Sequence, residues 1–78
     1  MRINVKYFGE IAEIIGKSSE MIDFEIEKKT DLKAFFKQKH PEIEEKMYKI
    51  AKNQEFCDFL LPEDEHVELA LLPPFAGG

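Results

Sequence analysis

The last six residues of the chain, Pro73-Pro74-Phe75-Ala76-Gly77-Gly78, have the types and order best suited to chemistry. Two prolines fix φ near −65° and favour an extended path, so they predict a stiff arm that carries its tip away from the fold. Glycine has no Cβ, so Gly77 and Gly78 can pass through a channel too narrow for any other residue. The reactive group that this tail would offer is the terminal carboxylate of Gly78.

Side chains elsewhere in the sequence offer no convincing catalytic site. Gly9 and Gly16-Lys17-Ser18 invite comparison with a phosphate-binding loop, but six residues separate the two glycines where such a loop has four. The six residues carry an amphipathic helical pattern, so Gly16 is better explained as the C-cap of a helix. The nucleotide-binding interpretation is therefore rejected.

The single cysteine and the two histidines are interpreted as structural or surface residues. Cys57 has neither a cation nor a helix N-terminus evident beside it to activate its thiol, so we expect a small core or half-buried residue. His40 precedes a proline at a helix end and His66 lies in an acidic turn, so both are expected on the surface. No Ser or Asp constellation completes either histidine as a catalytic base.

Size and composition exclude several classes of function. Seventy-eight residues predict one domain, residues 1–78, with little room for a deep substrate pocket. The net charge of −5 argues against a nucleic-acid partner held by its phosphates and favours a basic protein surface. One cysteine excludes a disulfide framework, and no metal-ligand spacing is evident. With no export signal or membrane span expected, we predict a cytoplasmic protein.

Apolar spacing predicts the elements that position the tail. Alternation with period two indicates half-buried strands at 3–7, 22–26 and 67–71. Spacing of i, i+3 and i+4 indicates a short helix that ends at Gly16 and a main helix over 32–39, capped by Thr30 or Asp31. Pro41 then begins either a continuation at an angle or a separate short helix over 42–46.

The second half of the chain is expected to contain short strands and turns. Tyr48 and Ile50 alternate with Lys49, and Asn53-Gln54 is typical of a hairpin turn that leads into a strand over 56–60. Residues 62–65 are polar and turn-like. The whole order predicts an α+β, ubiquitin-like β-grasp fold: a mixed sheet, one main helix across one face and an extended C-terminal tail, residues 73–78.

Strand parity predicts a docking surface at the root of the tail. Three residues of the first strand (Ile3, Val5, Tyr7) and three of the last (Val67, Leu69, Leu71) should point inward, so Phe8 and Leu72 should point outward. If the two strands are parallel neighbours, Phe8, Leu72 and Phe75 form an exposed apolar patch, and the partner-binding residues are Phe8, Leu72, Pro73, Pro74, Phe75 and Ala76. The alternative is that Phe8 tucks under a loop.

The segment Leu71-Leu72-Pro73-Pro74-Phe75-Ala76-Gly77-Gly78 resembles the C-terminus of the MoaD/ThiS family of sulfur carriers, most of all its members that serve molybdopterin synthase as the small subunit. The resemblance covers the whole chain, including the strand and short helix of 3–16 and the Asn53-Gln54 hairpin. Two features depart from the family pattern: Glu65-His66-Val67 replaces an Asp-Gly-Asp-like turn, and Lys52 stands where an aliphatic residue is usual.

The resemblance implies a two-stage mechanism in which Gly78 carries sulfur. A separate adenylating enzyme would use ATP and its own metal ion and basic side chains to join the Gly78 carboxylate to AMP. A sulfur donor would then form a thiocarboxylate. The large catalytic subunit of the synthase, in a heterotetramer, would transfer this sulfur to a pterin precursor and build the dithiolene of molybdopterin. The chain itself would bind no cofactor, metal, nucleic acid or membrane, and would act as a co-substrate.

Three alternatives remain open from the sequence. Another sulfur carrier could use the same Gly-Gly chemistry for thiazole or a different sulfur-containing metabolite. A ubiquitin-like modifier would join Gly78 to lysines of target proteins. A plain binding module would have a fortuitous terminus, and deletion of Gly77 and Gly78 would then leave its activity unchanged.

Overall fold

A computed structural model describes residues 1–74, so the predictions for Phe75, Ala76, Gly77 and Gly78 lie outside the described residues. The strands of the main sheet are β1 (Arg2–Tyr7), β2 (Ser19–Asp23), β4 (Lys49–Lys52), β5 (Glu55–Phe56) and β7 (Glu68–Leu72). The remaining elements are α1 (Gly9–Ile15), β3 (Thr30–Asp31), α2 (Leu32–Lys39), the 3-10 turn η1 (Pro41–Ile43) and β6 (Phe59–Leu60).

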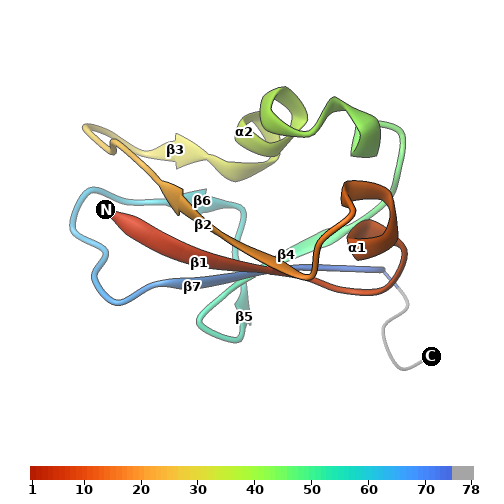
Figure 1. The fold of residues 1–78 in the computed structure, drawn as a ribbon. Helices are drawn as coiled ribbons and strands as arrows, with labels where there is room; N and C mark the ends of the chain where they lie inside the picture. Colours follow the sequence, from red (N-terminus) through yellow and green to blue (C-terminus); the bar gives the residue numbers. More distant parts are fainter. Residues whose placement is uncertain (75–78) are drawn as a thin grey trace.

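The main sheet is mixed, with the strand order β2-β1-β7-β4-β5. β1 pairs with β7 in parallel, whereas the other neighbours in this sheet are antiparallel. β3 and β6 form a separate antiparallel pair. Both helices lie on one face of the sheet, which Figure 1 shows nearly edge-on. This arrangement confirms the predicted α+β, ubiquitin-like fold.

The core lies between the main sheet and α2. Leu32 and Phe36 of the helix are fully buried, and Ile3, Val5, Tyr7, Leu69 and Leu71 meet them from the sheet, as parity predicted. Val67 lies just before β7 and packs against this core while remaining partly exposed. The carboxylate of Asp31 accepts a hydrogen bond from the Ala34 N–H at 3.2 Å, which confirms Asp31 as the N-cap of α2.

The second strand begins and ends earlier than the alternation at 22–26 predicted. Its ladder with β1 runs from a Tyr7 N–H bond to the Ser18 carbonyl (2.9 Å) to a Phe24 N–H bond to the Met1 carbonyl (2.8 Å). Phe24 is still buried because its ring packs on that of Phe35, with centroids 4.5 Å apart. Residues after the end of the strand are thus buried against α2, and this is why the alternation of apolar residues in the sequence continues beyond Asp23.

Two further predictions needed correction. The expected strand over 56–60 is split between β5 and β6, which belong to different sheets, because the Cys57 N–H bonds the Ile50 carbonyl and the Asp58 carbonyl accepts from Leu32. The helix expected over 42–46 is the short turn η1, which begins at Pro41. The hairpin turn is confirmed, since Asn53 and Gln54 both have positive φ, 51° and 71°. No helix within residues 1–74 is long and apolar enough to cross a membrane.

Candidate functional site

The root of the tail lies where β1 and β7 end side by side. Tyr7 is in register with Leu71, and the Phe8 N–H donates to the Leu71 carbonyl at 3.1 Å. Pro73 then passes close to Gly9, where a Cβ would lie 2.7 Å from the Pro73 Cγ. Gly9 also has a φ of +55°, which L side chains rarely adopt. The first turn of α1 and the start of the tail therefore fit together through a glycine.

Phe8 and Leu72 follow the paired Tyr7 and Leu71 and lie on the face of the sheet opposite to α2. Phe8 is 44% exposed, so it does not tuck under a loop, and Leu72 is partly exposed. Pro73 and Pro74 are partly exposed beside them. The structure thus places these four predicted partner-binding residues together at the tail root, while their role in binding stays a prediction.

Phe56 extends this apolar surface, and sequence reasoning missed it. Ala51 is in register with Phe56 on one side and with Ala70 on the other, so the three share one row of the outer face. Phe56 is 70% exposed, and the Lys49 ammonium lies 4.9 Å from the centroid of its ring. We call Phe8, Phe56, Ala70 and Leu72, together with Ala51, which is only 7% exposed, the outer apolar patch. The Asn53-Gln54 hairpin, which fixes the register of Phe56, was the signal that could have found it.

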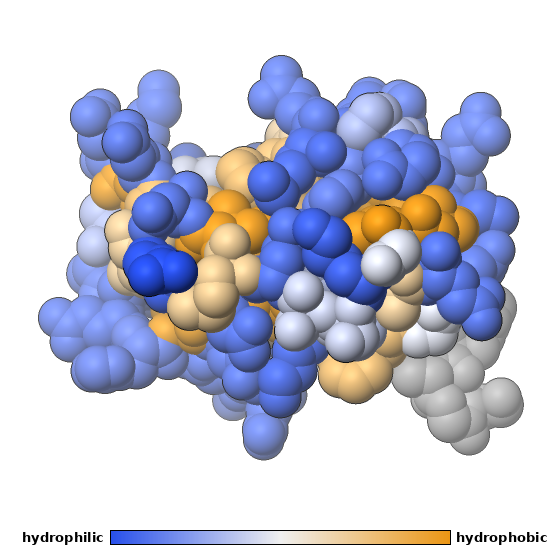
Figure 2. All heavy atoms as spheres, viewed as in Figure 1, coloured by the Kyte–Doolittle hydropathy of each residue, from blue (hydrophilic) through white to orange (hydrophobic). Residues whose placement is uncertain are grey.

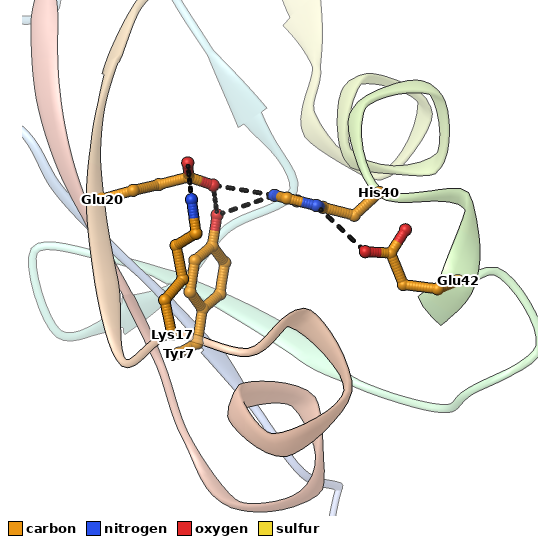
Figure 3. Close-up of polar contacts among 5 residues, drawn as sticks. All are labelled: Tyr7, Lys17, Glu20, His40 and Glu42. Carbon is orange, nitrogen blue, oxygen red and sulfur yellow. Dashed lines mark hydrogen bonds and ion pairs between the residues drawn. The ribbon is translucent and has the colours of Figure 1, made fainter.

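A group of polar side chains lies on the helix side of the sheet (Figure 3). The Tyr7 hydroxyl donates to Glu20 Oε1, which also lies 2.7 Å from His40 Nε2. Lys17 Nζ is 3.2 Å from Glu20 Oε2, and His40 Nδ1 is 3.5 Å from Glu42 Oε2. The inner polar cluster, defined as these five residues, joins β1, β2, the end of α2 and η1.

His40 is therefore not the surface residue that the sequence predicted. Its side chain is only 12% exposed because Pro41 ends the helix and turns the imidazole onto Tyr7, with ring centroids 5.8 Å apart. The residue acts as a bridge between the helix end and the sheet. His66, by contrast, is exposed as predicted.

Electrostatics fix the protonation states of Glu20 and Tyr7 near neutral pH. Burial alone would raise the pKa of Glu20, but hydrogen bonds from Tyr7, His40 and Lys17 outweigh it and lower the pKa to about 2. Burial, followed by the Glu20 carboxylate, raises the pKa of Tyr7. Glu20 therefore remains a carboxylate and Tyr7 a neutral donor. These groups satisfy one another, which is the behaviour of a structural clamp rather than of a catalytic pair.

Lys52 and Asp64 fix the loop that departs from the family pattern. Asp64 Oδ2 accepts from Lys52 Nζ at 2.9 Å and from the Leu61 N–H at 2.8 Å. Burial disfavours the charge on Lys52, but hydrogen bonds with Asp64 and Cys57 raise the pKa of its ammonium. A cation thus does lie beside Cys57, contrary to expectation, although Asp64 engages it. Cys57 is half-buried, as predicted, and its thiol donates to the Phe59 carbonyl.

The described residues offer no group of three His, Cys, Asp or Glu side chains placed to hold a metal ion. What the site does offer is a tail root, an exposed apolar surface and a rigid sheet behind both. Residues 5–78 match the sequence model of the ThiS family. The chain belongs to the ThiS family.

Full-length relatives agree with this assignment to the ThiS family. The chain is 34% identical over 86 residues to the molybdopterin synthase sulfur carrier subunit of Caenorhabditis elegans, and 30% identical over 84 residues to that of Caenorhabditis briggsae. Each alignment covers 97% of this chain and 96% of the relative.

Two solved structures share the fold. One is a putative molybdopterin converting factor, subunit 1, from Pyrococcus furiosus, with a TM-score of 0.74 at 17% identity over 95% of this chain and 98% of that one. The other is the small archaeal modifier protein 1 of Haloferax volcanii, with a TM-score of 0.64 at 20% identity over 94% and 97%. Both confirm the ubiquitin-like fold.

Proposed function

We propose that this chain is the sulfur carrier subunit of a molybdopterin synthase and that its reactive group is the carboxylate of Gly78. The observation that supports this most strongly is the similarity over 97% of the chain to two subunits of that name, together with a ThiS family match that extends to residue 78. The structure supplies a physical reason as well. The tail leaves the fold beside an exposed apolar surface, which suits docking on other proteins.

The proposed chemistry takes place in two steps on a partner enzyme. The Gly78 carboxylate attacks the α-phosphate of ATP, and pyrophosphate leaves. Hydrosulfide released by a sulfur donor then attacks the acyl-adenylate, so a C–S bond forms, the C–O bond to AMP breaks, and AMP leaves with the thiocarboxylate as the product. The attack joins two negative groups, so the adenylating enzyme must supply a metal ion and cations that offset the repulsion.

Sulfur transfer would then occur on the large catalytic subunit. There the thiocarboxylate sulfur would pass to a pterin precursor to build the dithiolene of molybdopterin, and the Gly78 carboxylate would be restored when water replaces the sulfur. The outer apolar patch would hold the carrier on this subunit while the tail enters its active site. A specific complex of this kind should bury at least about 1,200 Å² in total.

Mass spectrometry of the intact protein tests the proposal. We expect protein purified from sulfur-replete native cells to contain a fraction in which sulfur replaces one terminal oxygen, and we expect a variant lacking Gly78 to contain none. Persistent absence of the sulfur form in cells with a working donor would contradict the proposal. Gly78 found instead in isopeptide bonds to lysines of other proteins would identify a modifier.

A further inference from the structure

The edge strand β2 presents unpaired backbone groups in a regular pattern. Met1 and Phe24 exchange hydrogen bonds at 2.8 Å, and the Tyr7 N–H bonds the Ser18 carbonyl at 2.9 Å. Peptide groups in an antiparallel ladder alternate between the two sides of a strand. The even-numbered residues of β2 therefore face β1, and the peptide groups that face the open edge are those of Ser19, Met21 and Asp23.

This edge has no proline, bulge or covering strand among the described residues, and its charged side chains are Asp23 and the inward-facing Glu20. Natural proteins shield edge strands with lysine, proline, bulges or a covering element. β2 reads Ser-Glu-Met-Ile-Asp, pairs with β1 without a bulge, and has no strand on its other side within residues 1–74. Its central side chain, Met21, is 54% exposed. In Figure 1 the strand forms the border of the sheet.

We propose that β2 pairs antiparallel with β2 of a second copy of this chain, about a two-fold axis at Met21. Only the peptide groups of odd-numbered residues point toward the open edge and can bond to a second strand. The possible alignments of the two β2 strands therefore differ in steps of two residues. The register centred on Met21 is the one that pairs all five residues of the strand. It places Met21 opposite Met21 of the second copy, and Ser19 opposite Asp23 of the second copy.

The charges along the edge favour the same register. The Ser19 hydroxyl can donate to the Asp23 carboxylate of the second copy, and the two-fold axis repeats this pair. A shift of two residues in one direction instead places Ser19 opposite Glu25 and Met21 opposite Asp23, so a carboxylate meets the thioether. Like charges do not face each other in the centred register.

A groove lies beside β2, between this strand and α2, where the second copy would be placed. It is lined by Met21, Ile22 and Asp23 from β2 and by Phe35, Gln38 and Lys39 from α2, and has a volume of about 460 Å³. In this register Ile22 of the second copy lies opposite Glu20 on the helix side of the extended sheet, and Glu20 of the second copy lies opposite Ile22, which lines the groove. Pairing of five residues along one edge is a small contact compared with specific interfaces, which bury at least about 1,200 Å², so we expect a weak dimer that depends on concentration.

The dimer is independent of the proposed sulfur chemistry. Continuing the sheet through β2 keeps both α2 helices on one face and leaves the outer apolar patch of each copy uncovered. The strands of the two copies run in opposite directions, so the two tail roots lie at opposite ends of the assembly. Each copy can still meet a separate partner.

Sedimentation equilibrium of the untagged protein over a wide concentration range tests the pairing. We expect the average mass of the wild type to rise toward that of a dimer at high concentration. Met21→Pro should stay monomeric, since it removes an N–H that faces the open edge and leaves the β1 ladder intact. Met21→Val, which keeps the N–H and an apolar side chain, is the matched control and should still dimerise. Circular dichroism verifies that each variant is folded.

Charge variants test the register. Ser19→Lys should tighten the dimer at least several-fold and Ser19→Asp should weaken it by a similar factor, because residue 19 faces Asp23 twice in each dimer. Glu13→Gln, on an exposed position of α1, changes the net charge by the same amount as Ser19→Lys and should have little effect. A monomer at all concentrations, or a dimer that Met21→Pro leaves unchanged, overturns the proposal, and insensitivity to both Ser19 variants overturns the register.

Discussion

At the scale of single residues, Glu20 is the most strongly perturbed acid among those described. Its carboxylate accepts from a tyrosine, a histidine and a lysine that come from three different segments. The folded state lowers the pKa of this carboxyl group. Its contribution to stability is therefore complete above the pKa of the unfolded chain and is lost as the pH falls toward the pKa of the folded state. The cluster thus links the stability of the helix end to pH.

We expect Glu20→Gln to lower the free energy of unfolding at pH 7 by about 1.5 to 3 kcal/mol, the range for hydrogen bonds to charged groups. The folded pKa of about 2 lies below the ordinary value of 4.5, so the wild-type advantage is complete above pH 4.5 and disappears as the pH falls toward 2. Urea unfolding over this pH range measures the difference. The exposed Glu27→Gln variant serves as control, and an advantage that does not change with pH would refute the assignment.

Sequence reasoning could not find this cluster, and the reason is distance along the chain. Period two correctly placed Tyr7 on the inner face of its strand, but nothing local showed that residue 20 would lie opposite Val5 or that residue 40 would reach it. Only the register between β1 and β2 and the angle at Pro41 bring the three together. Contacts between distant segments depend on packing that a local pattern does not contain.

At the scale of elements, the contact between α1 and the tail root depends on a missing side chain. Gly9 combines a positive φ with close approach to Pro73, whereas Gly16, with a φ of +88°, has nothing within 4 Å of an added Cβ. Substituting Gly16 would therefore introduce backbone strain alone, whereas substituting Gly9 would add a steric clash with Pro73.

We expect Gly16→Ala to cost about 1 kcal/mol in the free energy of unfolding through backbone strain alone, and Gly9→Ala to cost more because its Cβ meets the Pro73 ring. Pro73→Ala removes that ring and should recover part of the loss. Urea denaturation of the four variants, including the double variant Gly9→Ala/Pro73→Ala, gives the coupling energy. Simple additivity of the two changes would contradict the contact.

The boundaries of helices and strands could be predicted from the sequence where they depend only on local features, such as alternating burial or a capping hydrogen bond. Alternation placed β1 and β7 closely because each has a buried and an exposed face. The N-cap of α2 followed from Asp31 for a similar reason, since the cap is a local hydrogen bond. The split between β5 and β6 could not be predicted, because it comes from the carbonyl of Asp58 bonding the start of a distant helix.

At the scale of the whole molecule, hydrophilic side chains surround separate apolar areas on the face shown in Figure 2, and the main sheet has a helix side and an outer face. The exposed aromatic residues with a place in the site, Phe8 and Phe56, belong to the outer face of that sheet rather than to the helix side. The molecule therefore has a structural side, occupied by the helices and the inner polar cluster, and a side available for partners.

We expect Phe8→Asp or Leu72→Asp to weaken binding to the large synthase subunit about tenfold or more, the usual effect of losing an apolar interface anchor. Both residues lie on the outer face, so the free energy of unfolding should change little. Isothermal titration calorimetry measures the affinity. Met47→Asp, at a side chain that is 75% exposed and outside the sheet, is the matched control. Unchanged affinity for either variant would remove that residue from the patch.

The fold and the tail root were predictable at this scale, whereas the full extent of the patch was not. Parity and the assumption that the first and last strands are parallel neighbours were enough to bring Phe8 and Leu72 together. Phe56 belongs to a two-residue strand, which is too short to show a period, so its face depends entirely on the register of the hairpin. The assignment of residues 1–78 to one domain stays a prediction.

The parallel pairing of β1 with β7 places strands from opposite ends of the described chain at the centre of the sheet. The ribosome synthesises β1 first, but its partner becomes available only when residue 72 has been made. Such long-range pairing also slows folding. A nascent or truncated chain consequently lacks the joined surface of Phe8 and Leu72. If the proposed function holds, partner enzymes that recognise this surface would bind only chains in which β1 and β7 have paired.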